Sequence, residues 1–121
     1  MSCIFDVDGE VVWSPALRIG QLFISIAQSL ADAAKVDLAE AGFTMMASDY
    51  YYVDPQALAT FVQGVLAGSV VKNPSYWELA RGFVATCLVM LERTGTPVEV
   101  PDEIARDLAA ARGVLSAMPR L

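Results

Sequence analysis

Three consecutive tyrosines, Tyr50, Tyr51 and Tyr52, form the densest group of phenol side chains in the sequence, and Asp49 and Asp54 flank them. Phenol rings at this density can line a site for an apolar or aromatic ligand, and a carboxylate beside them can accept or return a proton. The alternative is an extended segment whose rings pack against the rest of the fold. Because Asp54 precedes a proline and is expected to cap a helix, Asp49 is the acid/base candidate of the pair.

A second group of reactive side chains is spaced along one predicted helix. Glu78 and Arg81 are three residues apart, and Trp77 and Arg81 are four apart, so these side chains can meet on the helix surface. If the helix faces a cavity, Glu78 can act as acid or base and Arg81 can stabilise an anion; the alternative is a surface ion pair with a stacked ring. Trp13 is a further aromatic candidate for ligand binding, although we expect it to anchor the N-terminal segment.

The N-terminal string CIFDVDGEVV resembles the first motif of the haloacid dehalogenase phosphatases, in which two aspartates act as nucleophile and acid/base around Mg²⁺. The resemblance implies those roles for Asp6 and Asp8. Glu10 stands where that family usually has Thr, however, and the rest of the chain lacks the second acidic pair that completes the metal site. We therefore interpret Asp8 and Gly9 as a tight turn between two short strands.

Composition excludes several classes of site. The 121-residue chain has no His, only two Cys that lie far apart, and a net charge of −6. These counts exclude histidine-based triads and zinc sites built from Cys or His, and we expect neither a metal nor a cofactor. Because the few basic residues are scattered, we do not expect nucleic acid as a partner.

The cysteine content and the acidic N-terminus favour a reduced, cytoplasmic protein. The longest uncharged stretch, residues 55–71, places its apolar side chains on one side of a helix, so we expect an amphipathic helix rather than a membrane span. Hydrophobic residues make up 55% of this short chain. The surplus apolar surface must therefore line a pocket or a subunit interface.

Three dipeptides ending in proline, at residues 14–15, 54–55 and 73–74, are typical of helix starts. The sequence predicts helices over about residues 15–35, 55–70, 74–93 and 102–118, a β-hairpin over residues 1–13, and an irregular segment over residues 36–52. The string FVATCLVML, apolar on every side, predicts that the third helix is central. We therefore expect a mostly α, four-helix bundle-like single domain over residues 1–121, with a short N-terminal β-hairpin.

The first predicted helix has two apolar stripes. The narrower stripe consists of Leu17, Ile24 and Ala31, which are spaced by seven, and we expect it to contact another subunit. The main stripe is expected to face the core and contains Ile19, Leu22, Phe23, Ile26, Leu30 and Ala33.

Several strings resemble an actinobacterial family catalogued as domain of unknown function 6086: VVWSP at residues 11–15, VDP at residues 53–55 and GFVATCLVMLERTGTP at residues 82–97. The similarity covers about residues 1–100. It implies a small cytoplasmic bacterial protein and assigns no catalytic residue. Family members often have an acidic segment before VDP and a His before the proline of the third helix, where this chain has Tyr50 to Tyr52 and Asn73. This difference argues against a family-wide site at those positions.

These observations favour a helical interaction module of unassigned activity that associates as a homodimer. The alternative is a cofactor-free enzyme or binding protein for an apolar small metabolite in bacterial specialised metabolism. A third hypothesis is a regulatory or immunity protein whose acidic surface meets a basic partner. The metabolite hypothesis assigns acid/base or anion-stabilising roles to Asp49, Glu78 and Arg81, and ligand contacts to Trp13, Tyr50, Tyr51, Tyr52 and Trp77.

Overall fold

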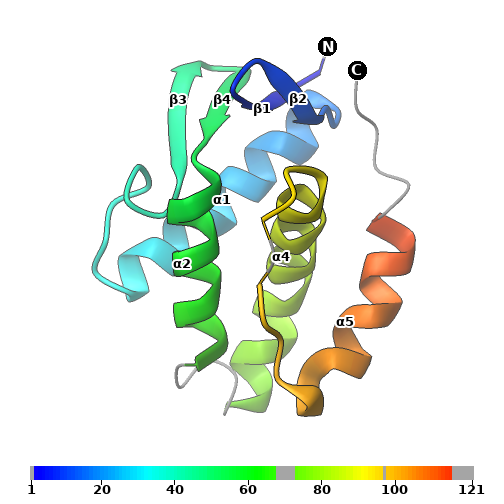
Figure 1. Cartoon of the computed structure of the whole chain (residues 1–121). Coiled ribbons are helices and arrows are strands. Elements are labelled where there is room, and N and C mark those ends of the chain that lie inside the picture. Colours follow the sequence, from blue (N-terminus) through cyan, green and yellow to red (C-terminus); the bar gives the residue numbers. More distant parts are fainter. Residues whose placement is uncertain (1, 68–72, 97, 116–121) are drawn as a thin grey trace.

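A four-stranded mixed sheet covers one end of the molecule (Figure 1). The computed structural model describes residues 2–67, 73–96 and 98–115. The strands lie in the order β2-β1-β4-β3. β1 (Ile4–Val7) pairs antiparallel with β2 (Glu10–Trp13), and β3 (Phe43–Ala47) pairs antiparallel with β4 (Tyr50–Val53). Parallel pairing of β1 with β4 joins the two hairpins into one sheet.

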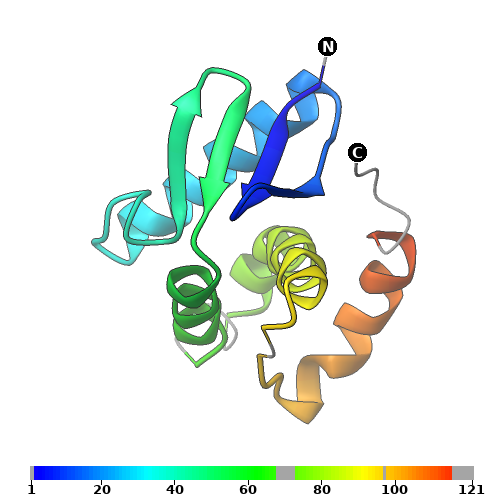
Figure 2. The same cartoon turned by 45° about the horizontal axis from the view of Figure 1, so that its top comes forward.

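The described residues also form four helices: α1 (Leu17–Ala33), α2 (Pro55–Ala67), α4 (Pro74–Arg93) and α5 (Asp102–Leu115). Figure 2 shows α1 crossing behind the sheet, with α4 in the centre of the helical layer and α2 and α5 on either side. These helices lie within the segments expected to be helical. The expected ends at residues 68–70 and 116–118 fall outside the described residues.

The prediction of a mostly α, four-helix bundle is wrong, because the chain has an α/β fold. The segment interpreted as irregular, residues 36–52, contains β3 and most of β4. Aromatic residues favour strands, but the three adjacent tyrosines do not show the alternation of polar and apolar residues that identifies a half-buried strand. The strands also depend on a pairing between residues far apart in sequence, which local patterns do not reveal.

The β1–β2 turn forms where Asp8 and Gly9 adopt positive φ angles of 51° and 86°. Both angles belong to the left-handed region that tight hairpins require, and Gly adopts it without strain. The Gly9 N–H donates a hydrogen bond of 2.7 Å to Asp6 Oδ1. The Asp6 carboxylate is therefore part of the turn.

α1 begins at Leu17, two residues after its expected start at Pro15. The Cys3 N–H donates a hydrogen bond of 2.8 Å to the Pro15 carbonyl, and Ser2 forms an isolated bridge with Ala16. These contacts hold the residues before the helix in an extended conformation beside the N-terminus.

Aromatic rings fill the space between the sheet and the helices. Phe5 on β1 stacks against Trp13 and Tyr51, with ring centroids 5.0 Å and 5.6 Å apart. Phe23 on α1 stacks against Phe83 on α4 at 5.0 Å. Residues 83–91 of α4 are all buried, as the apolar string predicted for a central helix.

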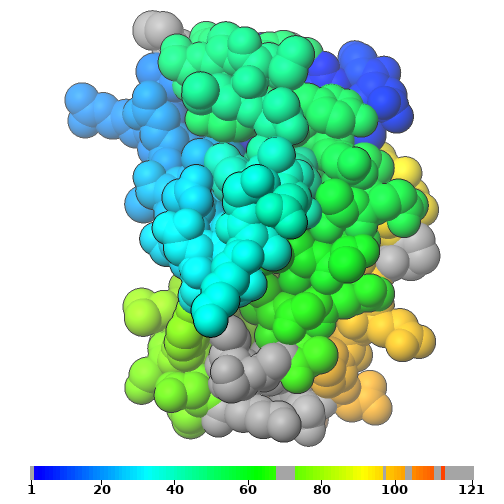
Figure 3. Space-filling view, turned by 90° about the vertical axis from the view of Figure 1, so that its left-hand side faces the viewer, coloured from blue at the N-terminus to red at the C-terminus, as the bar shows by residue number. Residues whose placement is uncertain are grey.

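The segment after α1 packs against α2, and Figure 3 shows the two side by side. Gly42 has a φ angle of 108°, and a Cβ atom added there would lie 2.8 Å from the backbone nitrogen of Leu58. Only glycine fits this conformation and this close approach. The Asp54 N–H donates to the Gly42 carbonyl at 2.9 Å, which fixes the chain where α2 begins.

The expected roles of the two α1 stripes are corrected by their burial. Ala31 is fully buried, and Leu17 and Ile24 are partly buried against the core, so the stripe assigned to another subunit packs within the chain. Ile19 and Leu22, assigned to the core, are exposed. The reason is the sheet, because α1 lies across it and turns a different side inward than it would in a helical bundle.

Candidate functional site

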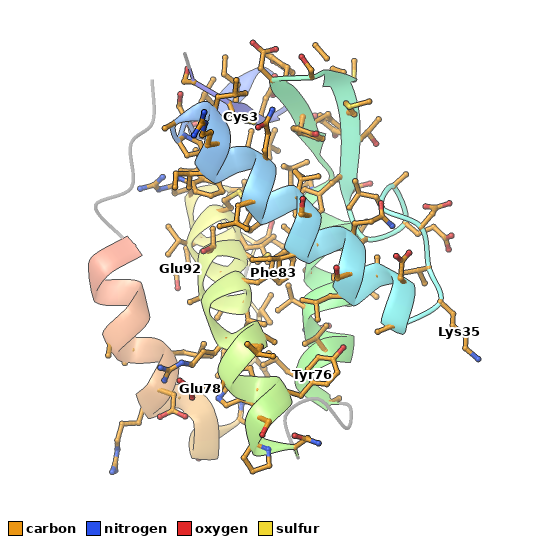
Figure 4. The ribbon with its side chains drawn as sticks, turned by 180° about the vertical axis from the view of Figure 1, so that it is seen from behind. Cys3, Lys35, Tyr76, Glu78, Phe83 and Glu92 are labelled. Atoms are coloured by element: carbon orange, nitrogen blue, oxygen red, sulfur yellow. The ribbon has the colours of Figure 1, made fainter. Side chains whose placement is uncertain are left out.

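The structure does not bring the three proposed catalytic residues together. Asp49 lies in the β3–β4 turn, where its backbone carbonyl accepts a hydrogen bond of 2.8 Å from the Ile4 N–H. Figure 4 labels Cys3, next to Ile4, and Glu78 at opposite ends of the molecule. Asp49 therefore cannot act on the same small substrate as Glu78.

Glu78 and Arg81 form a surface ion pair on α4. Arg81 Nη2 lies 2.7 Å from Glu78 Oε1, and the two side chains are 42% and 65% exposed, respectively. Exposed pairs of this kind contribute little to stability and have no apolar surroundings to strengthen them. Trp77 is buried instead, and its Nε1–H donates to Asp107 Oδ2 at 3.4 Å, which links α4 to α5.

The three tyrosines alternate across the sheet. Tyr51 points inward and is buried in the core with Trp13, so neither ring lines an open site. Tyr50 and Tyr52 lie on the opposite, outer face. Of the five proposed ligand-contacting residues, the structure therefore leaves two tyrosines on a common accessible surface.

Tyr50 and Tyr52 meet the two aspartates of the N-terminal hairpin, and we call these four residues the tyrosine–aspartate cluster. The Tyr50 hydroxyl donates a hydrogen bond to Asp6 Oδ2, and the Tyr52 hydroxyl donates to Asp8 Oδ1 at 3.4 Å. The parallel register that places Asp6 beside Tyr52 joins residues far apart in sequence. No local pattern in the sequence therefore indicates that these two motifs form one cluster.

The charge of the cluster favours protonated phenols. The hydrogen bond to Asp6 raises the pKa of Tyr50, with burial and the Asp6 charge as smaller causes. The Asp8 charge is the largest cause that raises the pKa of Tyr52. Both hydroxyls are therefore hydrogen-bond donors at neutral pH rather than bases. Among the described side chains, no group of three or more Cys, Asp or Glu is placed to hold a metal ion.

Both cysteines are free and buried. Burial raises the pKa of the Cys3 thiol, and it raises the pKa of the Cys87 thiol well above the ordinary value. Protonated, buried thiols are poor nucleophiles. Their role in this fold is to pack.

Exposed and partly buried apolar side chains of α1 and α4 form a second surface, which we call the α1–α4 face and define as Ile19, Leu22, Ile26, Tyr76 and Leu79. Leu79 is 82% exposed, Leu22 is 59% exposed and Ile19 is 52% exposed. Ile19, Leu22 and Ile26 follow one another at helical spacing along one side of α1. Burying such side chains is favourable, so this face is a candidate contact surface.

A groove of about 650 Å³ runs between the two helices of this face. Ser25, Ser29 and Ile26 line it from α1, and Tyr76 and Leu79 line it from α4. The small side chains of Ser25 and Ser29 leave space over α1, whereas Leu79 borders the groove on the α4 side. The groove can therefore accept an apolar side chain from outside the molecule.

The α1 side of the α1–α4 face carries no charge, and the charged side chains next to Leu79 on α4, Glu78 and Arg81, form an ion pair whose charges cancel. Residues 19–31 of α1 contain no charged side chain, although the whole chain carries a net charge of −6. The exposed polar residues of this stretch are Gln21, Ser25, Gln28 and Ser29. Depletion of charge and enrichment of apolar side chains are characteristic of the buried centre of protein interfaces.

Comparison with known proteins identifies the family of this chain. A family model described as a family of unknown function, DUF6086, matches residues 1–120. The chain therefore belongs to this family. Neither a curated protein nor a solved structure matches it. Within the described parts of the chain, none of the helices has the length and apolar character that crossing a membrane requires.

Proposed function

We propose that this member of the DUF6086 family is a homodimeric interaction module, in which two copies of the chain associate through the α1–α4 face. The observation that carries the proposal is the exposure of Ile19 and Leu22 on an uncharged stretch of α1, together with that of Leu79 in the groove between α1 and α4. Apolar area removed from water contributes about 25 cal/mol per Å². Association gives these side chains the burial that their own fold does not provide.

A second copy of the chain suits this face because of its neutrality. Two molecules that each carry a net charge of −6 repel one another, and the repulsion is least where the contact itself has no charge. In a two-fold dimer, the same face serves both partners. Leu22 of one copy would enter the groove between α1 and α4 of its partner, where Ser25 and Ser29 leave space.

The sheet offers a less suitable surface for self-association. Met45 and Met46 on β3 are exposed, but the outer face of the sheet carries the exposed Asp8 and, beneath Tyr50, the buried Asp6. Two copies meeting there would bring carboxylates together, and like charges across an interface oppose association. This difference makes Met46 a control position for the dimer test.

The same proposal includes a cytoplasmic location in an actinobacterial cell. Two buried, unpaired cysteines suit a reducing compartment, where disulfides are rare. The resemblance in the N-terminal and third-helix strings is the basis for the bacterial group.

Charge substitutions on the α1–α4 face test the proposal. We expect the unmodified chain to sediment as a dimer at high micromolar concentration, and Leu22→Lys and Leu79→Lys to sediment as monomers. Because both side chains are exposed, the variants should keep the far-ultraviolet circular dichroism of the folded chain. Met46→Lys, which adds the same charge on β3, should remain a dimer. A monomeric unmodified chain, or face variants that stay dimeric, would overturn the proposal.

A further inference from the structure

A second groove, of about 750 Å³, lies between the end of α1, the outer side of α2 and the first turn of α4. It opens on the side of the molecule drawn in Figure 3, between α2 and the segment that follows α1. Leu30, Phe61 and Val65 form its apolar floor, and all three are buried. We call it the α1–α2 groove. Its volume suits a small organic molecule.

Polar groups stand at the rim of the α1–α2 groove. Gln56 and Thr60 are exposed on α2, and Glu40 lies across from them on the segment after α1. The Thr60 hydroxyl donates its proton to the Gln56 carbonyl at 3.0 Å. The oxygen lone pairs of Thr60 therefore remain available to accept a hydrogen bond from a ligand.

The Glu40 side chain is held in position by the backbone of Asp37. The Asp37 N–H donates to Glu40 Oε1 at 3.3 Å, and the Glu40 N–H donates to Asp37 Oδ1 at 2.8 Å. This reciprocal pair resembles a capping box and restrains the Glu40 side chain. A carboxylate has more acceptor sites than this bond uses, so it can still accept from a ligand.

The charge at the α1–α2 groove is negative. Among the described residues that line it, none is basic, and Glu40 is the charged one. Lys35 is close in sequence, but Figure 4 shows its side chain extending away from the molecule. A bound cation would therefore meet a carboxylate, whereas a bound anion would meet the same carboxylate without a compensating positive charge among the described lining residues.

We propose that the α1–α2 groove binds small organic amines, with the apolar part of the ligand on Leu30, Phe61 and Val65 and the protonated nitrogen at Glu40. Burial of the ligand against the apolar floor provides affinity, and the polar rim determines which head group is preferred. The inference goes beyond self-association and does not depend on it, since the groove is formed within one copy of the chain.

Three probes with the same ring and chain test the choice of head group: phenylbutylamine, phenylbutanol and phenylbutanoate. At neutral pH the first is cationic, the second neutral and the third anionic. Titrations followed by ¹H–¹⁵N NMR should move the amide signals of Ala57, Thr60 and Gly64. We expect the amine to bind about threefold more tightly than the alcohol, and the carboxylate to bind more weakly than both.

Gly64→Leu tests the location. Gly64 lines the α1–α2 groove, and a Cβ atom added there would meet no atom within 4 Å, so the side chain of a leucine can start there and occupy part of the groove. We expect this variant to lose at least about tenfold in amine affinity while remaining folded, because leucine favours helices more than glycine does. Gly82→Leu is the matched control, since Gly82 on α4 also faces open space but does not line this groove.

Glu40→Gln tests the charge. The amide oxygen of glutamine keeps an acceptor for the Asp37 N–H, so the loop is preserved while the negative charge is removed. We expect the amine to fall to the affinity of the alcohol and the alcohol to be unaffected. The proposal would be overturned if the amine and the carboxylate bound equally tightly, or if Gly64→Leu bound the amine as the unmodified chain does. It would also be overturned if the amide signals that shift belonged to residues outside the groove. Failure of the dimer test would leave these results unaffected, so the two proposals are distinguishable.

Discussion

At the scale of single residues, close contacts decide how the helices meet the sheet. Gly20 is buried on α1 where the helix crosses β1. A Cβ atom added to Gly20 would lie 2.4 Å from Cys3 Cβ and 2.7 Å from Cys3 Sγ. Both side-chain atoms belong to a fully buried residue, so they cannot move aside easily. The absence of a side chain at Gly20 is therefore a packing requirement.

We expect Gly20→Ala to destabilise the fold by about 1–3 kcal/mol, because overpacking outweighs the gain of about 1 kcal/mol that alanine brings to a helix. Gly64→Ala, in open space on α2, should instead stabilise it by about 0.5–1 kcal/mol. Urea unfolding of both variants measures the difference. Shifts of the two midpoints in the same direction would contradict the packing seen at Gly20.

The tyrosine–aspartate cluster makes the stability of the fold fall as the pH becomes alkaline. Because the folded-state pKa of Tyr50 is raised above its unfolded value, its contribution is fully present below the unfolded pKa of about 10. It is lost as the pH rises through the folded-state pKa. We expect the stability advantage of the unmodified chain over Tyr50→Phe to shrink above about pH 10. Denaturant unfolding of both proteins across this range is the measurement, and parallel pH curves would contradict the role given to Tyr50.

At the scale of elements, the sequence identified what is determined locally. Asn73 precedes a proline, and its side chain caps α4 as that pattern predicts. The burial of residues 83–91 also followed from a local apolar run. The sheet could not be predicted in the same way, because the pairing of Ile4 with Tyr50 depends on the whole fold. The inward side of α1 was predicted only in part for the same reason, since Phe23 and Leu30 are buried as expected whereas Ile19 and Leu22 are exposed.

The Asn73 cap supports the central helix. Its Oδ1 accepts hydrogen bonds from the Ser75 and Tyr76 N–H groups, both at 3.1 Å. We expect Asn73→Ala to lower the free energy of unfolding by about 1 kcal/mol, because these N–H groups lose their acceptor. Asn73→Asp keeps an acceptor oxygen and should be nearly neutral. Thermal or urea unfolding compares the three proteins, and equal stability of the alanine variant would show that the cap contributes nothing.

At the scale of the whole molecule, composition predicted surplus apolar surface but not its position. Helical spacing grouped Ile19 and Leu22 with the core, and only the position of the sheet leaves them on the α1–α4 face. The candidate catalytic residues lie apart for a similar reason, since Asp49 follows β3 whereas Glu78 lies near the start of α4. Composition thus predicted an interface, and the exposed side chains of α1 and α4 are where we propose that it lies.

The central claim, that two copies meet through the α1–α4 face, can be tested atom by atom. Isotope-filtered NMR on a mixture of labelled and unlabelled chain, at high micromolar concentration, detects protons of one copy that lie close to the other. We expect intermolecular signals at the methyl groups of Ile19, Leu22 and Leu79, and none at Met45 or Met46. Intermolecular signals confined to the β3 methionines, or a complete absence of such signals, would contradict it.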